Sequence, residues 1–372
     1  MLYSQPNNTL TKIAQEAVAC ATCTVACAQN DIPMLSMHSI LDCTRLMQYR
    51  PTGAVTGMGE RRKGRAMATK IEWVRNADGS AGESWNPLRA RRKSDGKVGW
   101  FCTKVSTGCT HCYSERMNNR MGTALPYTAA SLDEIEVFLD RKVLQKPLHW
   151  TRKARTVFVC SMTDLFHEVV PIHVISQIFE LMSQARQHTF QVLTKRPERA
   201  LEFYLWAKKI DGWAFGYPNV WLGTSVENQA AADERIPWLL QTPAAVRFVS
   251  CEPLLGAVDL SQPYVDYLEG WDVEAVHVCG GDERVCHRRC PEAQQYQTER
   301  LDWVICGTES GPGARSWDWD WIRSLRDQCQ TARVPFFLKQ ITVDGKKVPL
   351  PELDGRTWSE MPVRTQAQEV EK

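Results

Sequence analysis

Short apolar runs alternate with amphipathic stretches from about residue 156 to residue 338. This alternation predicts buried parallel strands connected by helices. Buried parallel strands are apolar on both faces, whereas the helices that cover them are apolar on one face only. The predicted strands are residues 156–160, 190–193, 220–223, 246–250, 303–306 and 335–338. The predicted helices are residues 172–185, 197–210, 229–240 and 317–331. The pattern therefore predicts an α/β fold with a parallel sheet, built as a full or partial (β/α) barrel.

Polar side chains follow each predicted strand. They include Ser161, Asp164, Thr194, Lys195, Ser225, Glu227, Glu252 and Glu309. The carboxyl ends of parallel strands share one mouth, which is where α/β barrels carry their chemistry. Ser, Thr, Asp and Glu are also typical of helix N-caps and first turns. Lys195 and Arg196 are unsuited to the positive end of a helix, so we expect a binding site at this mouth.

The two ends of the chain differ from its centre. Residues 1–66 show little apolar periodicity and end in a basic run, after which Met67 resembles a natural start. We therefore expect residues 1–66 to be a poorly ordered extension, residues 67–362 the main domain and residues 363–372 a tail. Residues 262–300 interrupt the strand–helix pattern, which predicts an insertion loop.

Composition limits the compartment. The chain has 372 residues, 43% hydrophobic, with fourteen cysteines and a net charge of +2. A secreted disulfide protein is the competing interpretation, but the N-terminus has no signal-peptide pattern. No apolar run approaches the length of a membrane span. We therefore expect a cytoplasmic protein with metal-bound thiols, in which any polyanion site is local.

Three cysteines form the strongest chemical motif, because Cys102, Cys109 and Cys112 have the spacing C-x6-C-x2-C. A structural zinc needs a fourth ligand, and His111 between two cysteines would crowd the metal. A disulfide would leave one thiol over. A [4Fe–4S] cluster on three thiolates leaves one iron free to bind S-adenosylmethionine (SAM), although the familiar spacing for that use is C-x3-C-x2-C. The spacing favours the cluster and leaves zinc open, and the amphipathic stretch after Cys112 is expected to form a helix.

Other cysteines form weaker groups. Cys20, Cys23 and Cys27 lie in the extension, and Cys279, Cys286 and Cys290 lie with His287 in the insertion. A second metal site is chemically feasible at either place. Neither spacing is a strong signature, so both remain open.

Eight ordered motifs between about residues 70 and 362 resemble a phage and prophage protein family with a three-cysteine motif, an unusual branch of the radical SAM superfamily. The matching stretches are SWNP at 84–87, CTKVSTGCTHCY at 102–113, SMTDLFH at 161–167, LTKRPER at 193–199, WLGTSVENQ at 221–229, RFVSCEPLLG at 247–256, LDWVICGTESGPGAR at 301–315 and LDGRTW at 353–358. The chain departs from the family pattern at Thr308, where the family has Gly, and at Cys251, where it has Leu.

The resemblance implies a barrel of radical SAM type that uses a [4Fe–4S] cluster, SAM and a cellular one-electron reductant. Some members look like isomerases that convert N-alpha-glycinylthymidine to C-alpha-glycinylthymidine in the DNA of phages, which would place this chain in the host cytoplasm. By their places at strand ends, we assign Lys195, Glu252 and Glu309 to catalysis. Ser161, Asp164, Thr194, Ser225 and Glu227 are the expected SAM-binding residues, and Cys102, Cys109 and Cys112 the expected cluster ligands.

Substrate contacts and rival functions follow from the same residues. Lys195 or Arg196 is expected to bind the glycine carboxylate. The basic residues Arg89, Arg91, Arg92, Lys93 and Lys97 are candidates for phosphate binding, although a solvated basic loop explains them equally well. The alternatives are another radical SAM modification or repair reaction on nucleic acid, and a zinc-bound nucleic-acid-binding protein without catalysis.

Overall fold

The computed structural model describes residues 69–211, 217–262, 265–274, 294–297 and 299–362. They lie within one compact unit, Arg65–Lys372. The predicted extension and tail lie outside the described residues, as do the cysteine groups at 20–27 and 279–290. In the described part of the chain, no helix is both long and apolar enough to cross a bilayer.

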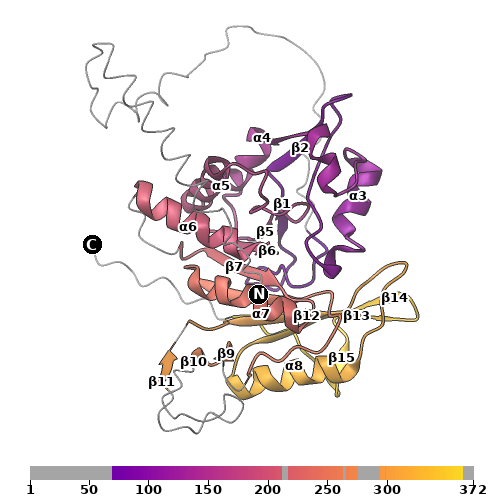
Figure 1. The fold of residues 1–372 in the computed structure, drawn as a ribbon, viewed down its shortest axis with the longest axis vertical. Helices are drawn as coiled ribbons and strands as arrows, with labels where there is room; N and C mark the ends of the chain where they lie inside the picture. Colours follow the sequence, from indigo (N-terminus) through magenta and orange to yellow (C-terminus); the bar gives the residue numbers. More distant parts are fainter. Residues whose placement is uncertain (1–68, 212–216, 263–264, 275–293, 298, 363–372) are drawn as a thin grey trace, which may run out of the picture. The chain divides into compact units, whose positions relative to one another are not determined.

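Eight strands form one mostly parallel sheet in the order β1-β5-β6-β7-β8-β12-β13-β14 (Figure 1). The strands are β1 (Glu83–Trp85), β5 (Thr156–Val159), β6 (Thr189–Thr194), β7 (Val220–Ser225), β8 (Val246–Cys251), β12 (Trp303–Gly307), β13 (Phe336–Val343) and β14 (Lys346–Pro349). Every neighbouring pair from β1 to β13 is parallel, and β14 pairs antiparallel with β13. The six predicted strands are confirmed, and the spatial order follows the chain order.

Four helices connect the parallel strands, as predicted. They are α5 (Ile172–Gln184), α6 (Pro197–Asp211), α7 (Gln229–Gln241) and α8 (Trp319–Ala332). The side chain of Asn228 caps α7 and that of Asp318 caps α8, so both helices begin where a hydrogen-bonding side chain replaces the missing carbonyl. Their apolar faces join one core with alternate strand residues such as Val192 and Val304.

The face of the sheet that points away from the helices packs around Trp73, and these contacts show that the sheet is curled. The Trp73 ring lies 4.8 Å from that of Phe158 on β5 and 6.0 Å from that of Trp303 on β12. Those strands are four spacings apart, which is about 19 Å in a flat sheet. Contact of both rings with one indole requires a curled sheet, so the fold is a partial barrel whose inner core also contains Phe248 and Phe337.

Most of the smaller elements were not predicted. An antiparallel sheet is formed by β2 (Leu88–Arg92), β3 (Val98–Gly99) and β4 (Ile135–Leu139), and β15 (Glu352–Leu353) pairs with β16 (Arg356–Thr357). The predicted insertion loop is in part a three-stranded antiparallel sheet of β9 (Val265–Asp266), β10 (Trp271–Glu274) and β11 (Gln294–Gln297). The remaining short helices are η1 (Thr107–Cys109), α3 (Tyr113–Met121), η2 (Ala129–Glu134), α4 (Arg141–Leu144) and η3 (Lys146–His149).

The inner core leaves no room for a side chain at Gly223 on β7. A Cβ atom there would meet the Phe248 ring at 2.5 Å, so Gly223→Ala forces the paired strands apart. We expect a loss of about 1–3 kcal/mol of unfolding free energy, measured by urea denaturation. Gly256→Ala is the matched control, because its Cβ would meet the nearest atom at 3.5 Å. Equal stability of the two variants would contradict this packing.

Candidate functional site

The three cysteines lie in a loop that contains η1 and ends at the start of α3. Cys102 precedes η1, Cys109 is the last residue of η1, and Cys112 is the N-cap of α3. None of the three forms a disulfide, and all three residues are partly exposed. The helix predicted to follow Cys112 is confirmed as α3.

The thiols share one electrostatic environment. Burial is the main reason that the pKa of Cys102 is raised to about 12; the charges of Asp164, Cys112 and Cys109 act in the same direction, and the charge of Arg196 opposes them. Burial also raises the pKa of Cys112, and the charge of Cys109 adds to that effect. In the described part of the chain, no group of three His, Cys, Asp or Glu side chains is arranged to hold a single metal ion. The three thiols are neighbours, because Cys109 and Cys112 act on the pKa of Cys102 and Cys109 acts on that of Cys112.

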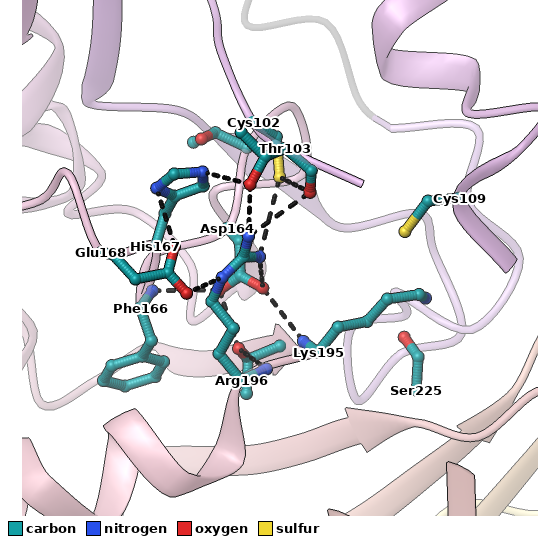
Figure 2. Close-up of polar contacts among 12 residues, drawn as sticks. Cys102, Thr103, Cys109, Asp164, Phe166, His167, Glu168, Lys195, Arg196 and Ser225 are labelled. Carbon is teal, nitrogen blue, oxygen red and sulfur yellow. Dashed lines mark hydrogen bonds and ion pairs between the residues drawn. The ribbon is translucent and has the colours of Figure 1, made fainter. Parts of the chain in front are cut away.

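The guanidinium of Arg196 is the centre of a buried network beside Cys102 (Figure 2). Its Nη1 atom lies 3.9 Å from Cys102 Sγ and donates to Asp164 Oδ2 at 3.2 Å. Its Nε donates to Glu168 at 2.8 Å, and its Nη2 donates to the Thr103 hydroxyl at 2.8 Å. Burial alone would lower the pKa of Arg196, but Asp164, Cys102 and Glu168 raise it above its usual value. A permanent positive charge therefore lies against one thiol.

Asp164 fixes this guanidinium by joining the ends of β5 and β6. Its Oδ1 accepts from the Thr194 hydroxyl at 2.7 Å and from Phe166 N at 3.0 Å. Its Oδ2 accepts from Lys195 N at 3.0 Å as well as from Arg196. Asp164 and Thr194, which we expected to bind SAM, are thus hydrogen-bonded to protein groups and hold Arg196 in place.

His167 extends the network as a neutral donor. Val169 N donates to its Nδ1 at 3.1 Å, which assigns the ring proton to Nε2. Nε2 lies 2.9 Å from the Thr103 hydroxyl and donates to it. Burial, together with the charge of Arg196, lowers the pKa of His167 to about 4. His167 and Arg196 therefore both orient the loop residue that follows Cys102.

Glu309 ties the opposite side of the cysteine loop to the end of β12. Its carboxylate accepts from Arg315 Nε at 2.9 Å and from Arg315 Nη2 at 2.5 Å, and His111 Nδ1 lies 3.0 Å away. Arg315 Nη1 also donates to Thr107 O at 2.9 Å. Burial would raise the pKa of Glu309, but Arg315 and His111 lower it to about 2. Glu309, expected as a catalytic residue, is therefore a charged anchor for the loop.

Glu227 lies directly behind the cysteine loop at the end of β7. Its Oε2 accepts from Arg235 Nη1 at 2.8 Å, and the same nitrogen donates to Ser225 O at 2.8 Å. A Cβ on Gly108 would meet the Glu227 carboxylate at 3.0 Å. Burial would raise the pKa of Glu227, but Lys195 and Arg235 lower it. The glycine between the thiols thus allows the loop to touch a buried carboxylate.

The far strands supply a further ion pair. Lys339 Nζ on β13 contacts Glu252 at 2.6 and 2.8 Å, and Gln340 Nε2 donates to Glu252 at 3.1 Å. The Tyr113 hydroxyl donates to Ser161 O, and the charge of Glu252 adds to burial in raising the pKa of Tyr113. Ser161 and Glu252, two of the predicted site residues, therefore lie near the start of α3.

Lys195 differs from the other charged residues of the mouth. Figure 2 shows its side chain extending between Cys109 and Ser225. Its charge lowers the pKa values of Glu227 and Cys112. Among the residues with described positions, its ammonium has no hydrogen-bond or ion-pair partner. It is the cation of this site that is available to a ligand.

The basic stretch before the cysteines is engaged in internal contacts. Arg91 pairs with Glu136 at 2.8 Å, and Arg92 pairs with Asp95. Arg89 is stacked 4.5 Å from the centre of the Trp100 ring, and the Lys93 ammonium donates to Asp133 O at 2.9 Å. Two of the five predicted phosphate-binding cations are therefore ion-paired within the protein, and two more make other internal contacts.

Several residues of the site were not identified from sequence. Arg235 and Arg315 neutralise Glu227 and Glu309, and Thr103, His167 and Glu168 surround Arg196. A usable signal existed for Arg315, because Gly311 and Gly313 with positive φ let the loop turn back onto Glu309. No comparable local signal marks the partners of Arg196, which come from other strand ends.

Comparison with known proteins places the chain in a family without assigning an activity. Residues 68–362 match a family described as protein of unknown function (DUF5131). No curated protein and no solved structure matches the chain. The matched region contains the sheet, the covering helices and the three-cysteine loop. The chain therefore belongs to the DUF5131 family.

Proposed function

We propose that this protein is a radical SAM enzyme in which Cys102, Cys109 and Cys112 hold a [4Fe–4S] cluster. The observation that carries the proposal is the position of the three thiols, at the carboxyl edge of a parallel sheet with the Arg196 charge against Cys102. Three cysteine thiolates fit a [4Fe–4S] cluster, because each can bind a different iron and the fourth iron then has no protein ligand. The buried guanidinium offsets part of the negative charge that thiolates bring.

The bound cluster and SAM would supply one-electron cleavage of the sulfonium and abstraction of a hydrogen atom, while the protein supplies position and excludes water. The Arg196 network fixes Cys102 from one side. Glu309, through Arg315 and His111, fixes the loop from the other. Ser225 and Lys195 remain beside the thiols as groups able to bind SAM or substrate.

For the substrate we propose N-alpha-glycinylthymidine in DNA, converted to C-alpha-glycinylthymidine. The bond between the glycine nitrogen and the thymine methylene carbon breaks, and a bond between the glycine α-carbon and that methylene carbon forms. The product has the same atoms as the substrate. With 5′-deoxyadenosine released, each turnover would consume one SAM, two electrons from the reductant and one proton, which together replace the hydrogen atom taken from the α-carbon. Hydrogen abstraction from the unactivated α-carbon is the step that side-chain acids and bases perform poorly. The target base would have to leave the DNA stack.

Lys195 is the proposed partner of the glycine carboxylate, because Arg196 is saturated by Asp164, Glu168 and Thr103. Lys195→Gln should lower kcat/KM roughly 10–100-fold, the equivalent of about 1.5–3 kcal/mol for a hydrogen bond to a charged group. Iron content should not change, and Lys195→Arg should recover part of the activity. A substrate carboxamide should be a poor substrate for the wild type, with little further loss in Lys195→Gln. Equal discrimination by both proteins would contradict this role.

The reaction is tested with reduced, reconstituted protein, SAM and DNA that contains N-glycinylthymidine. Nucleosides released by digestion are analysed by mass spectrometry and chromatography, which separate the isomers although their masses are equal. We expect C-alpha-glycinylthymidine and 5′-deoxyadenosine, both absent with Cys109→Ala. Unchanged modified nucleosides together with SAM cleavage would refute the isomerase proposal and leave another radical SAM reaction. A different altered nucleoside would identify that reaction.

A further inference from the structure

One face of α3 is unusually apolar for an exposed helix. Tyr113, Met117 and Met121 follow one another at i, i+4 and i+8, with exposures of 46, 36 and 56%. The hydroxyl of Tyr113 is bonded to Ser161 O, so it is the ring that remains open to solvent. Residues at this spacing form one stripe along a helix. The stripe begins at the residue directly after the third thiol.

The same face carries positive charge only. Arg116 and Arg120 are exposed and stand one turn apart beside the methionines. The acid of α3, Glu115, is 13% exposed and is paired with Lys104 at 3.0 Å. Arg116 also approaches Ser310 O at 3.4 Å, which fixes one end of the face against the loop after β12. We call Tyr113, Arg116, Met117, Arg120 and Met121 the α3 face.

The composition of the α3 face is typical of a protein interface. Tyr, Met and Arg are enriched in interface cores, whereas Lys, Glu and Asp are depleted. Methionine side chains adapt to a partner surface and do not bind phosphates. A site that follows a nucleic-acid backbone would need a longer run of cations, and two arginines separated by Met117 do not supply one. The charge therefore fits an acidic protein.

We propose that the α3 face docks an acidic one-electron carrier protein with a flavin or iron–sulfur group. This inference rests on the proposed function, which requires an electron for the cluster at Cys112. The reduced carrier gives up one electron and is oxidised, and the cluster accepts that electron and is reduced. Docking beside Cys112 gives the electron a short path, because α3 begins at the residue after that ligand.

The test compares two variants with the same change of charge and polarity at the last turn of a helix. Arg120→Glu with Met121→Asp alters the α3 face, and Lys209→Glu with Ile210→Asp alters an exposed basic–apolar pair on α6. Affinity for purified flavodoxin and for an acidic ferredoxin is measured by titration at several salt concentrations. Basic cytochrome c and a DNA oligonucleotide serve as contrasting probes.

We expect both acidic proteins to bind the wild type and the α6 variant, with affinity that falls as salt rises. The α3 variant should bind at least tenfold more weakly and be reduced correspondingly more slowly by the carrier, while dithionite reduces all three proteins equally. Failure of the wild type to bind either acidic protein would overturn the proposal, as would equal binding by the α3 variant or a loss confined to DNA binding. Because binding is measured without regard to iron, an iron-free protein would defeat the proposed function separately.

Discussion

Cys109→Ser should abolish the iron and sulfide content of the protein while leaving its fold unchanged. The thiol is partly exposed at the end of η1, so its replacement removes a ligand without opening a cavity in the core. A three-thiolate cluster cannot lose one ligand and keep its coordination. Cys329→Ala is the control, because that residue is fully buried on the core face of α8 and lies outside the cysteine loop.

The measurement is iron and sulfide per chain after anaerobic reconstitution, together with a thermal melt of each variant. We expect background iron in Cys109→Ser and full iron in Cys329→Ala. The equivalent change at Cys102 or Cys112 should give the same loss. Retention of iron by all three single variants would show that the cluster, if present, uses other ligands.

Arg196→Met should be the most destabilising substitution of the site. It leaves the buried Asp164 carboxylate without its ion-pair partner, and breaking a buried pair in this way costs about 3–5 kcal/mol. A fall in Tm of roughly 10 °C follows for a domain of this size. The cluster should also be held less tightly, because the charge beside Cys102 Sγ is removed. Calorimetry and iron analysis measure the two effects independently.

A double variant separates burial of charge from a general packing defect. Asp164→Asn with Arg196→Met leaves no buried unpaired charge, because Glu168, the other acid on Arg196, is 62% exposed. The double variant should therefore recover much of the stability lost in Arg196→Met. It should not recover iron binding, because the positive charge next to Cys102 is still absent. Recovery of iron in the double variant would show that the unpaired Asp164 carboxylate, and not the missing charge beside Cys102, caused the loss of iron.

The fold was largely predictable from sequence because its strands are buried on both faces. The run at Val220–Ser225 is buried at every position, and such runs separated by amphipathic helices indicate a parallel sheet directly. β1 escaped prediction because it has three residues and pairs with β5, more than 70 residues later. Trp73 also gave no local signal, since its place inside the curled sheet depends on rings from several strands.

The location of the site was predictable from the sequence, but the roles of its residues were less so. Strand-end residues do gather near the cysteine loop, as the register of parallel strands requires. The sequence did not reveal that Arg196 is enclosed by Asp164 and Glu168, because those acids lie on a loop from the neighbouring strand. For the same reason the sequence could not tell which of Lys195 and Arg196 binds a ligand. The structure leaves only Lys195 of the two available.

The central claim, a three-cysteine [4Fe–4S] cluster that binds SAM, is tested most directly by electron paramagnetic resonance. The protein is purified anaerobically, reduced with dithionite and measured with and without SAM, alongside iron and sulfide analysis. We predict about four irons per chain and the signal of a reduced [4Fe–4S] cluster, which changes on addition of SAM. A colourless protein that contains zinc and no iron would contradict the account, as would a cluster signal that does not change when SAM is added.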